Sequence, residues 1–308
     1  TVFENIATPL IMTRLALRQR LPIVGLLSGR RHRVMREIAD EVRSVAAQLQ
    51  IERLLDRRPG QLSHGQRQRV ALGRAMVRHP AVFLMDEPLS SLDPELRAHM
   101  RTELMELHAR LRTTFIYVTH DQTEAMTMSD RLAVMRGGRI LQLATPSALY
   151  DRPESRTVAE FIGTPRINLF EGGVDAEGRV HVLGNRLPIH LDLPAGARVS
   201  VGLRPESLIP RGTGELIAGD AILRARLRLC ENLGPEQILH FRLADEPPLT
   251  AVCRRPRDDT ETLSGGETTL HFAAADCHVF GPDGARLAWR QERPVRPETV
   301  AGEALGVE

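Results

Sequence analysis

Three side chains with catalytic chemistry follow two short apolar runs. Residues 81–88 (AVFLMDEP) contain Asp86 and Glu87, and residues 113–120 (TTFIYVTH) end in His120. Runs this short and this continuously apolar indicate buried central strands of an α/β sheet. Because open α/β sheets bind ligands at the carboxyl ends of their strands, we expect the three side chains to meet at one edge. An Asp there can hold Mg²⁺, usually through water, and an adjacent carboxylate can orient or deprotonate an attacking water.

A Ser/Gly turn ahead of the first run is a candidate phosphate site. In LSHGQ (62–66), Ser63 and Gly65 open a predicted helix, where free backbone N–H groups attract anions. Each feature also has an ordinary structural explanation. Ser63 can be a plain helix N-cap, Asp86 and Glu87 can cap the following turn, and a lone histidine at a strand end is usually a surface residue. In this order and spacing, however, the combination is typical of a nucleotide hydrolase.

Amphipathic helices are expected around the two strands. Residues 34–51 carry one apolar stripe at helical spacing, formed by Ile38, Val42, Val45, Ala46 and Leu49. Residues 14–36 contain Pro, Gly and clustered Arg, which predicts a loop or broken helix. After the first strand, Asp93 suits a helix N-cap and Pro94 the first helical position. The inward stripe of that helix would be Leu96, Met100, Leu104, Leu107 and Leu111.

Shorter signals follow the second strand. Asp121 and Glu124 are spaced as a capping pair, the glycines at 137–138 predict the turn of a hairpin, and Thr145 suits the N-cap of a further helix. This alternation of strands and helices indicates a mostly parallel sheet. From about residue 166 onward, short alternating strands separated by Gly, Pro and Asp pairs predict a small all-β barrel.

The composition indicates a chain of two domains. It has 308 residues, and its 41 cationic and 39 acidic side chains leave a net charge of +2, so there is no electrostatic footprint for nucleic acid or an anionic membrane. Every one of those cations is arginine, and lysine is absent. The three cysteines are far apart and lack metal-ligand spacing, which suits a reduced cytosolic protein. No signal peptide is visible, and no apolar run is long enough to span a membrane.

The stretch 62–93, together with YVTHDQTEAM (117–126), resembles the ATPase subunit of an ABC transporter. The matching parts are the signature motif (Leu62 to Gln66), the Walker B strand (Val82 to Asp86), the adjacent Glu87, the D-loop (Ser91, Leu92, Asp93) and the switch histidine His120. The resemblance implies that Asp86 helps to hold Mg²⁺ through water, that Glu87 is the general base, and that His120 contacts the γ-phosphate of ATP.

The resemblance also implies a site shared between two subunits. Ser63, His64, Gly65 and Gln66 would contact the ATP held by the opposite subunit, and the D-loop residues Ser91, Leu92 and Asp93 would lie at the dimer interface. The signature motif usually carries Gly where His64 stands. Since a side chain there crowds the approach of a phosphate to the backbone, we expect reduced rather than abolished function.

The phosphate-binding loop of this family is missing from the sequence. That loop, GxxxxGK[ST], uses a lysine to reach the β- and γ-phosphates, and this chain has none. Arginine is no simple substitute, because a planar fork does not mimic an ammonium ion in a tight nest of amides. In the family, the phosphate-binding loop and the Q-loop precede a segment like TVFENIA (1–7), so we expect the chain to be N-terminally incomplete.

The predicted fold class is α/β: the later part of a P-loop NTPase domain of the ABC type, with its helical subdomain, followed by a small all-β barrel of the OB or TOBE type. We predict a helical subdomain with the signature motif (1–80), a RecA-like part (81–165), a TOBE-like regulatory domain (166–290) and a disordered tail (291–308). VGLRPESL (201–208) is similar to the TOBE-type domain of importer ATPases that serve carbohydrates and glycerol phosphate.

The leading functional hypothesis is an ATP- and Mg²⁺-dependent motor subunit of an importer for a sugar or related solute. Its partners would be a second ATPase subunit, as a homodimer or a mixed pair, integral membrane permease subunits and, indirectly, a periplasmic or extracellular solute-binding protein. It would lie peripherally on the cytoplasmic face of the inner membrane. The alternative is a non-hydrolysing remnant that donates its signature motif to an intact partner. A soluble ABC protein acting on nucleic acid is disfavoured by the TOBE-like domain and the balanced charge, so no nucleic acid partner is expected.

Overall fold

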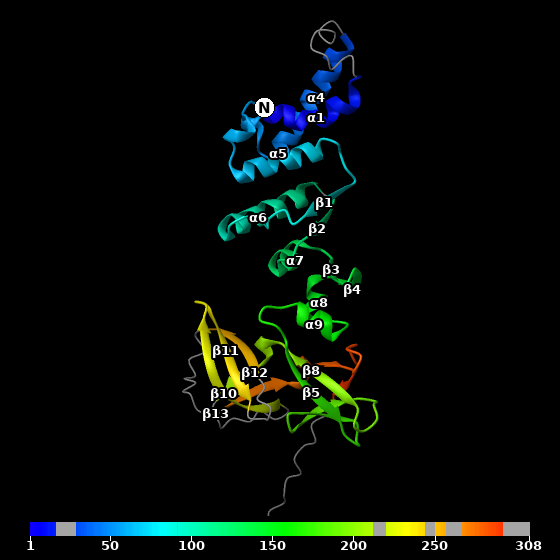
Figure 1. Cartoon of the computed structure of the whole chain (residues 1–308), viewed down its shortest axis with the longest axis vertical. Coiled ribbons are helices and arrows are strands. Elements are labelled where there is room, and N and C mark those ends of the chain that lie inside the picture. Colours follow the sequence, from blue (N-terminus) through cyan, green and yellow to red (C-terminus); the bar gives the residue numbers. More distant parts are fainter. Residues whose placement is uncertain are drawn as a thin grey trace, which may run out of the picture. The chain divides into compact units, whose positions relative to one another are not determined.

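The computed structural model describes residues 1–16, 29–90, 92–111, 113–211, 220–243, 250–256 and 267–291. The chain divides into two compact units, Thr1–Met128 and Ser129–Glu308, and each is described by itself (Figure 1). The predicted disordered tail, apart from its first residue, lies outside the described residues. Among the helices in the described ranges, none is long and apolar enough to cross a membrane.

Unit 1 is mainly helical and contains one small sheet. Its elements are α1 (Val2–Arg14), α4 (Gly29–Gln48), the 3-10 turns η1 (Glu52–Leu54) and η2 (Pro59–Gln61), α5 (His64–Met76), β1 (Val82–Asp86), α6 (Pro94–Leu111), β2 (Thr114–Val118) and α7 (Gln122–Met128). Since α4 begins at Gly29, the predicted loop or broken helix over 14–36 is wrong for its last part, where the helix simply starts earlier. Residues 17–28 of that prediction lie outside the described residues.

The helical core of unit 1 forms where α1, α4 and α5 pack together. The predicted apolar stripe of α4 is confirmed, because Ile38, Val42, Val45 and Ala46 are all buried. Gly73 permits the close approach of α5: a Cβ atom there would lie 3.1 Å from Leu49 Cδ1 and 3.2 Å from Ile6 Cδ1.

β1 and β2 pair in parallel, as predicted, and Asp86 is opposite Val118 in the register. The prediction that β1 is a buried central strand is wrong for the described residues. Phe83 packs inward and meets Phe115 with 4.9 Å between ring centroids, but Leu84 on the opposite face is 77% exposed. The physical reason is that the sheet has only two strands here, and no described element covers its outer face. The same face exposes Val82, Ile116 and Val118.

The caps predicted on either side of β2 have different outcomes. Asp93 caps α6 as predicted, since its Oδ1 accepts from the Leu96 N–H at 3.0 Å. Asp121 likewise caps α7 through the Thr123 N–H at 2.7 Å. The Glu124 side chain, however, does not complete a capping box. It is buried and turns toward β2, where it serves another purpose described below.

Unit 2 begins with a hairpin and two short helices and continues as an all-β region. Its elements are β3 (Leu132–Arg136), β4 (Arg139–Ala144), α8 (Pro146–Asp151), α9 (Arg156–Phe161), β5 (Asn168–Val174), β6 (Arg179–Val182), β7 (Asn185–His190), β8 (Arg198–Leu203), η3 (Pro205–Ser207), β9 (Ile209–Arg211), β10 (Asp220–Asn232), β11 (Glu236–Leu243), β12 (Thr250–Pro256), β13 (Glu267–Ala273), η4 (Ala274–Asp276), β14 (His278–Phe280) and β15 (Arg290–Gln291). The predicted turn at Gly137 and Gly138 is confirmed, since both have positive φ, as a tight hairpin requires. Thr145 caps α8 as predicted.

Two antiparallel sheets build the all-β region. Within the described residues, one sheet has the order β12-β11-β10-β13-β9 and the other β14-β8-β5-β6-β7-β15 (Figure 1). Both contribute to one continuous core, whose fully buried members include Phe170, Val201, Leu203, Phe241 and Leu270. This arrangement, with one face of each curled sheet on a shared core, agrees with the predicted all-β class.

The segment 129–165 packs with the all-β region, whereas the predicted boundary at 165/166 separated the two. The Arg156 N–H donates to the Gly284 carbonyl at 2.8 Å, and the Arg286 N–H donates to the Glu154 carbonyl at 2.9 Å. The buried Arg204 of the sheet region also donates to the carbonyls of Ala159 and Tyr150. These contacts join residues far apart in the sequence, which local patterns do not reveal.

We expect Ile6→Ala to lower the free energy of unfolding of unit 1 by ~2–5 kcal/mol, because Ile6 is fully buried where α1 meets α5. Denaturant unfolding followed by far-UV circular dichroism measures this. Leu84→Ala is the matched control, since Leu84 is exposed and its truncation should change stability by less than ~0.5 kcal/mol. Equal losses from both substitutions would contradict the core assigned here.

Asp175 is expected to make unit 2 acid-sensitive. Burial by itself raises the pKa of Asp175, but hydrogen bonds from His181, the Arg179 N–H and Arg186 outweigh it, so the net pKa lies well below its usual value. A depressed folded-state pKa gives stability that is present above the unfolded pKa of about 3.9 and is lost as pH falls through the folded value. The Asp175→Asn variant should therefore have a lower Tm than the wild type at pH 7. Below about pH 4 the gap between the two Tm values should become smaller. A difference that grows on acidification would refute this.

Candidate functional site

The ends of β1 and β2 bring two of the predicted catalytic side chains together. Glu87 follows β1 directly, and His120 comes two residues after β2. Their side chains meet with 3.1 Å between His120 Nδ1 and Glu87 Oε1. Both are accessible, with side-chain exposures of 72% for His120 and 48% for Glu87. A carboxylate and an imidazole in contact at an open sheet edge can hold and transfer a proton of a bound water.

The backbone at Glu87 explains how this contact arises. Glu87 has φ of +44°, a left-handed conformation that is costly for a residue with a side chain. Its N–H donates to the Val118 carbonyl at 2.9 Å, so the first residue after β1 remains tied to the end of β2. The turn that follows is held by Ser90, whose N–H and hydroxyl both donate to the Glu87 carbonyl. Strained residues of this kind cluster at functional sites.

Asp86 is the last residue of β1 and is exposed. Its carboxylate is a suitable oxygen donor for Mg²⁺, but the described residues contain no group of three His, Cys, Asp or Glu side chains that could hold a metal ion. Mg²⁺ keeps several waters and is commonly bound by one or two carboxylates together with substrate phosphates. The donor set at Asp86 therefore fits Mg²⁺ that arrives with a nucleotide, and does not form an all-protein metal cage.

The predicted phosphate turn has the geometry of a well-capped helix start. Ser63 caps α5: its Oγ accepts from the Gln66 N–H at 3.3 Å, and the Gln66 side chain accepts from the Ser63 N–H at 3.0 Å. His64 is exposed on the first turn. The N–H groups of His64 and Gly65 make no hydrogen bond within the described part of the chain, as is usual at a helix start. They are free to bind an anion.

Gly65 also has a packing role that the sequence did not suggest. A Cβ atom at this position would lie 3.0 Å from Met100 Sδ on α6. One turn further along α5, Arg69 makes a two-pronged ion pair with Glu103 of α6. Gly65 and Arg69 therefore face the same helix, and they fix how α5 lies against α6.

Gln68 connects α5 to the turn that carries Glu87. Its side-chain N–H donates to the Pro88 carbonyl at 3.2 Å. The signature turn and the Glu87–His120 pair share no direct hydrogen bond or ion pair in the described residues, so Gln68 is the link between their elements. Sequence reasoning missed this residue, because a glutamine inside a helix carries no signal of its partner.

The predicted D-loop is only partly described, because Ser91 lies outside the described residues. Leu92 is buried, and Asp93 is occupied as the N-cap of α6. Arg97, which sequence reasoning also missed, donates to the Leu92 carbonyl at 2.9 Å and lies 3.7 Å from the Asp121 carboxylate. It thus ties the D-loop to the residue that follows His120.

A buried carboxylate supports the loop that carries His120. Glu124 accepts hydrogen bonds from the Tyr117 hydroxyl at 2.9 Å and the Thr119 hydroxyl at 2.7 Å. Burial raises the pKa of Tyr117, and the hydrogen bond to Glu124 raises it further, so the phenol remains a proton donor. The spacing of Asp121 and Glu124 suggested a capping pair, and only the fold shows that Glu124 turns inward instead.

Comparison with known proteins gives two family matches. Residues 1–90 match the ABC transporter family, and residues 201–280 match the TOBE domain. A solved structure of CbiO1 from Clostridium perfringens, described as part of the ABC transporter complex CbiONQ, covers 48% of this chain and 52% of its own at 26% identity. Its TM-score is 0.40, too low to support a statement about architecture.

Several curated proteins are similar over most of the chain. The sn-glycerol-3-phosphate import ATP-binding protein UgpC of Chromobacterium violaceum is 42% identical over 81% of this chain and 66% of its own length. UgpC of Cupriavidus pinatubonensis is 48% identical over 77% and 68% of the two chains. The sulfoquinovosyl glycerol transport ATP-binding protein SmoE of Agrobacterium fabrum is 48% identical over 76% and 65%. The chain thus spans about two thirds of the length of these relatives, and at this identity it belongs to the ABC transporter family of ATP-binding proteins.

Proposed function

We propose that this chain acts in an ATP-hydrolysing motor subunit of an importer for a sugar or a related solute such as glycerol phosphate. Its family consists of ATPases that are coupled to transport. The observation that carries the proposal is the contact between Glu87 and His120 at the end of two parallel strands, with Glu87 held in a left-handed backbone. The names of its relatives, which include import proteins for glycerol phosphate and a sulfoquinovosyl glycerol transporter, support the choice of solute class.

The proposed roles of the side chains come from the family resemblance, and the contact between Glu87 and His120 supports them. Glu87 orients the attacking water and accepts its proton. His120, whose Nδ1 lies 3.1 Å from Glu87 Oε1, positions the Glu87 carboxylate and donates a hydrogen bond to the γ-phosphate. Asp86 holds a water of the Mg²⁺ ion, which neutralises charge on the phosphates when ATP is bound. The free N–H groups of His64 and Gly65, on the turn Ser63–Gln66, bind the phosphate of a nucleotide on a second subunit.

The proposed partners are a second ATPase subunit, membrane permease subunits and, indirectly, a solute-binding protein outside the membrane. The second subunit is needed because the family resemblance assigns Ser63, His64, Gly65 and Gln66 to the nucleotide held by the opposite subunit. Ser91, Leu92 and Asp93 would line the contact between the two subunits. The proposed place of action is the cytoplasmic face of the inner membrane, through the permease.

The alternative is that the chain donates its signature motif without hydrolysing ATP. This alternative applies to the 308 residues taken by themselves, since they contain no lysine and the phosphate-binding loop of the family requires one. The two possibilities differ in what Glu87 does: it is essential in the first and dispensable in the second.

We expect the purified 308-residue chain to release phosphate from MgATP no faster than its Glu87→Gln variant. The reason is that no lysine is available to hold the β- and γ-phosphates beside Glu87. A phosphate-release assay at millimolar ATP makes the comparison. A turnover that Glu87→Gln abolishes would show that the chain binds and hydrolyses ATP by itself.

Gly65→Ala tests the shared site. We expect MgATP to promote binding between the chain and the 48% identical import ATP-binding protein of Cupriavidus pinatubonensis, and Gly65→Ala to weaken that nucleotide-dependent binding about tenfold or more. The added methyl group would lie 3.0 Å from Met100 Sδ, so the Met100 side chain or the first turn of α5, which carries the free N–H groups, must shift. Gly60→Ala is the matched control, since a Cβ atom at residue 60 meets nothing within 4 Å.

Pull-down with tagged chain in the presence and absence of MgATP measures this binding. Equal weakening by Gly60→Ala and Gly65→Ala, or binding that is indifferent to MgATP, would argue against a nucleotide at the signature turn.

A further inference from the structure

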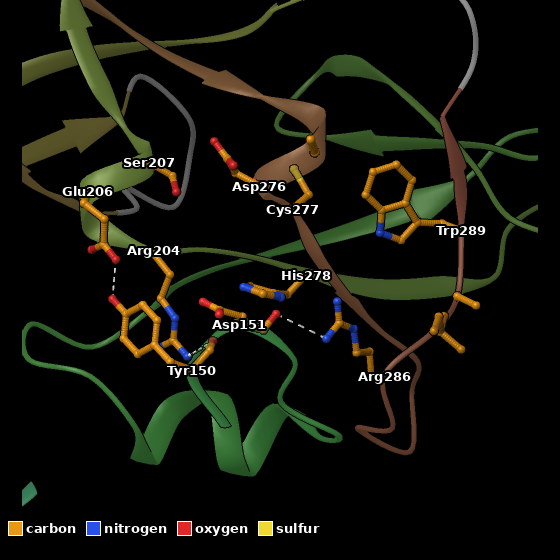
Figure 2. Close-up of a pocket in the computed structure, with 13 residues that line it drawn as sticks. Tyr150, Asp151, Arg204, Glu206, Ser207, Asp276, Cys277, His278, Arg286 and Trp289 are labelled. Carbon is orange, nitrogen blue, oxygen red and sulfur yellow. Dashed lines mark hydrogen bonds between the residues drawn. The ribbon is translucent and has the colours of Figure 1, made fainter. Parts of the chain in front are cut away.

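Unit 2 contains a polar cavity of about 580 Å³. It lies between the end of α8, the η3 turn after β8, the η4–β14 junction and the segment that leads to β15. Figure 2 shows the side chains that line it, with His278 between Arg204 and Arg286. Every residue that lines the cavity follows the residues of the proposed nucleotide site in the sequence.

Arg204 forms a fixed wall of this cavity. It is only 4% exposed, and its guanidinium lies 4.1 Å from the centre of the Tyr150 ring. Its N–H groups donate to the carbonyls of Tyr150, Ala159 and Ile162, but Nε is buried without a partner. No carboxylate neutralises this guanidinium by direct contact in the described residues, and burial lowers the pKa of Arg204.

His278 is a second buried polar group without a protein partner. It is 8% exposed, and its Nδ1 is buried and makes no hydrogen bond. Burial lowers the pKa of His278 to about 4, and the charges of Arg286 and Arg204 contribute to the lowering. The imidazole is therefore neutral at pH 7 and lies near two cationic side chains. Unpaired buried polar groups are rare, and each one calls for an explanation.

Arg286 supplies the charge that a ligand can reach. Its Nη1 donates only a long hydrogen bond of 3.4 Å to the Asp151 carbonyl. It makes no ion pair with a carboxylate in the part of the chain that the structure describes, although it is partly buried. A guanidinium has five N–H donors in a planar fork that matches an oxyanion, and most of those of Arg286 remain available.

The acidic side chains limit what else the ligand can carry. Glu206 on η3 already accepts a hydrogen bond from the Tyr150 hydroxyl, and Asp151 and Asp276 also line the cavity. A second anionic group would meet these carboxylates. The rest of the ligand would instead be neutral and would lie against Leu287 and Trp289.

We propose that this cavity binds a small molecule with a single oxyanion group, a phosphate or a carboxylate, whose oxygens accept hydrogen bonds from Arg286 and His278. His278 Nδ1, which has no partner, and the Arg286 guanidinium, which has no ion pair in the described residues, both lie at this cavity and support this class of ligand. The ligand would act on unit 2, so the site is a candidate for control of the chain by a metabolite.

The test is binding of inorganic phosphate and, separately, of acetate to the full chain, with chloride at equal ionic strength as the blank. Calorimetry measures affinity, and NMR of the labelled imidazoles follows His278, whose signal is identified by its loss in His278→Gln. We expect saturable binding of at least one anion and a rise in the pKa of His278 from about 4 toward its ordinary value of about 6.5. Tighter phosphate or tighter acetate binding tells which oxyanion the cavity prefers. The charged and titratable residues that share the cavity with His278 are Tyr150, Asp151, Arg204, Glu206, Asp276, Cys277 and Arg286. Of these, Arg286 and Arg204 contribute to lowering its pKa.

Arg286→Gln should weaken binding by about tenfold or more, because a charge-assisted hydrogen bond is lost. Arg290→Gln is the matched control: it removes the same charge from an exposed arginine that pairs only with Asp192, and should change affinity by less than about twofold. Arg286→Lys keeps the positive charge but loses the planar guanidinium, so its affinity should be intermediate. An intermediate affinity also shows that the substituted chain still folds. Absence of saturable binding, equal weakening by Arg286→Gln and Arg290→Gln, or an unmoved His278 pKa would overturn the proposal.

Discussion

The hydrogen bond from the Glu87 N–H to the Val118 carbonyl is the constraint on which the candidate site depends. This bond continues the pairing of β1 and β2 one residue beyond Asp86. Glu87 makes it with a left-handed backbone conformation. The strand ends then place Glu87 beside His120, although the two residues come from different elements. The position of Glu87, the proposed general base, is therefore set by backbone geometry, and the buried Glu124 beneath the His120 loop keeps that geometry in place.

The helices of unit 1 connect this edge to the signature turn. Arg69 and Glu103 fasten α5 to α6, and Gln68 bonds to the carbonyl of Pro88, one residue after Glu87. Gly65 lets α6 approach α5, because a Cβ atom there would lie 3.0 Å from Met100 Sδ. A displacement of α5 would therefore move or break the Gln68–Pro88 hydrogen bond and so disturb the turn at Glu87. This is the physical connection through which events at the two half-sites can influence each other.

Unit 2 is organised differently, around a buried cation. Arg204 leaves the end of β8 and satisfies carbonyls at the ends of α8 and α9, and thereby attaches these helices to the sheets. The cost of burying that charge is offset by the Tyr150 ring and by carbonyl oxygens in place of a carboxylate. The neighbouring cavity is lined by Arg204 and Arg286 together with Asp151, Glu206 and Asp276. The proposed oxyanion site therefore lies beside the same buried arginine that attaches the two helices.

The sequence by itself determined the features that depend on a few neighbouring residues. It predicted the helix caps at Ser63, Asp93 and Thr145, the hairpin turn at residues 137–138, the parallel strand pair and the family. It did not reveal the exposed outer face of β1, the inward turn of Glu124, or the roles of Gln68 and Arg204, and it divided unit 2 at 165/166. Caps and turns are decided by backbone groups within one helical turn. Burial and the choice of hydrogen-bond partner are decided by contacts between segments that only the tertiary structure brings together, such as Arg204 with the carbonyl of Tyr150.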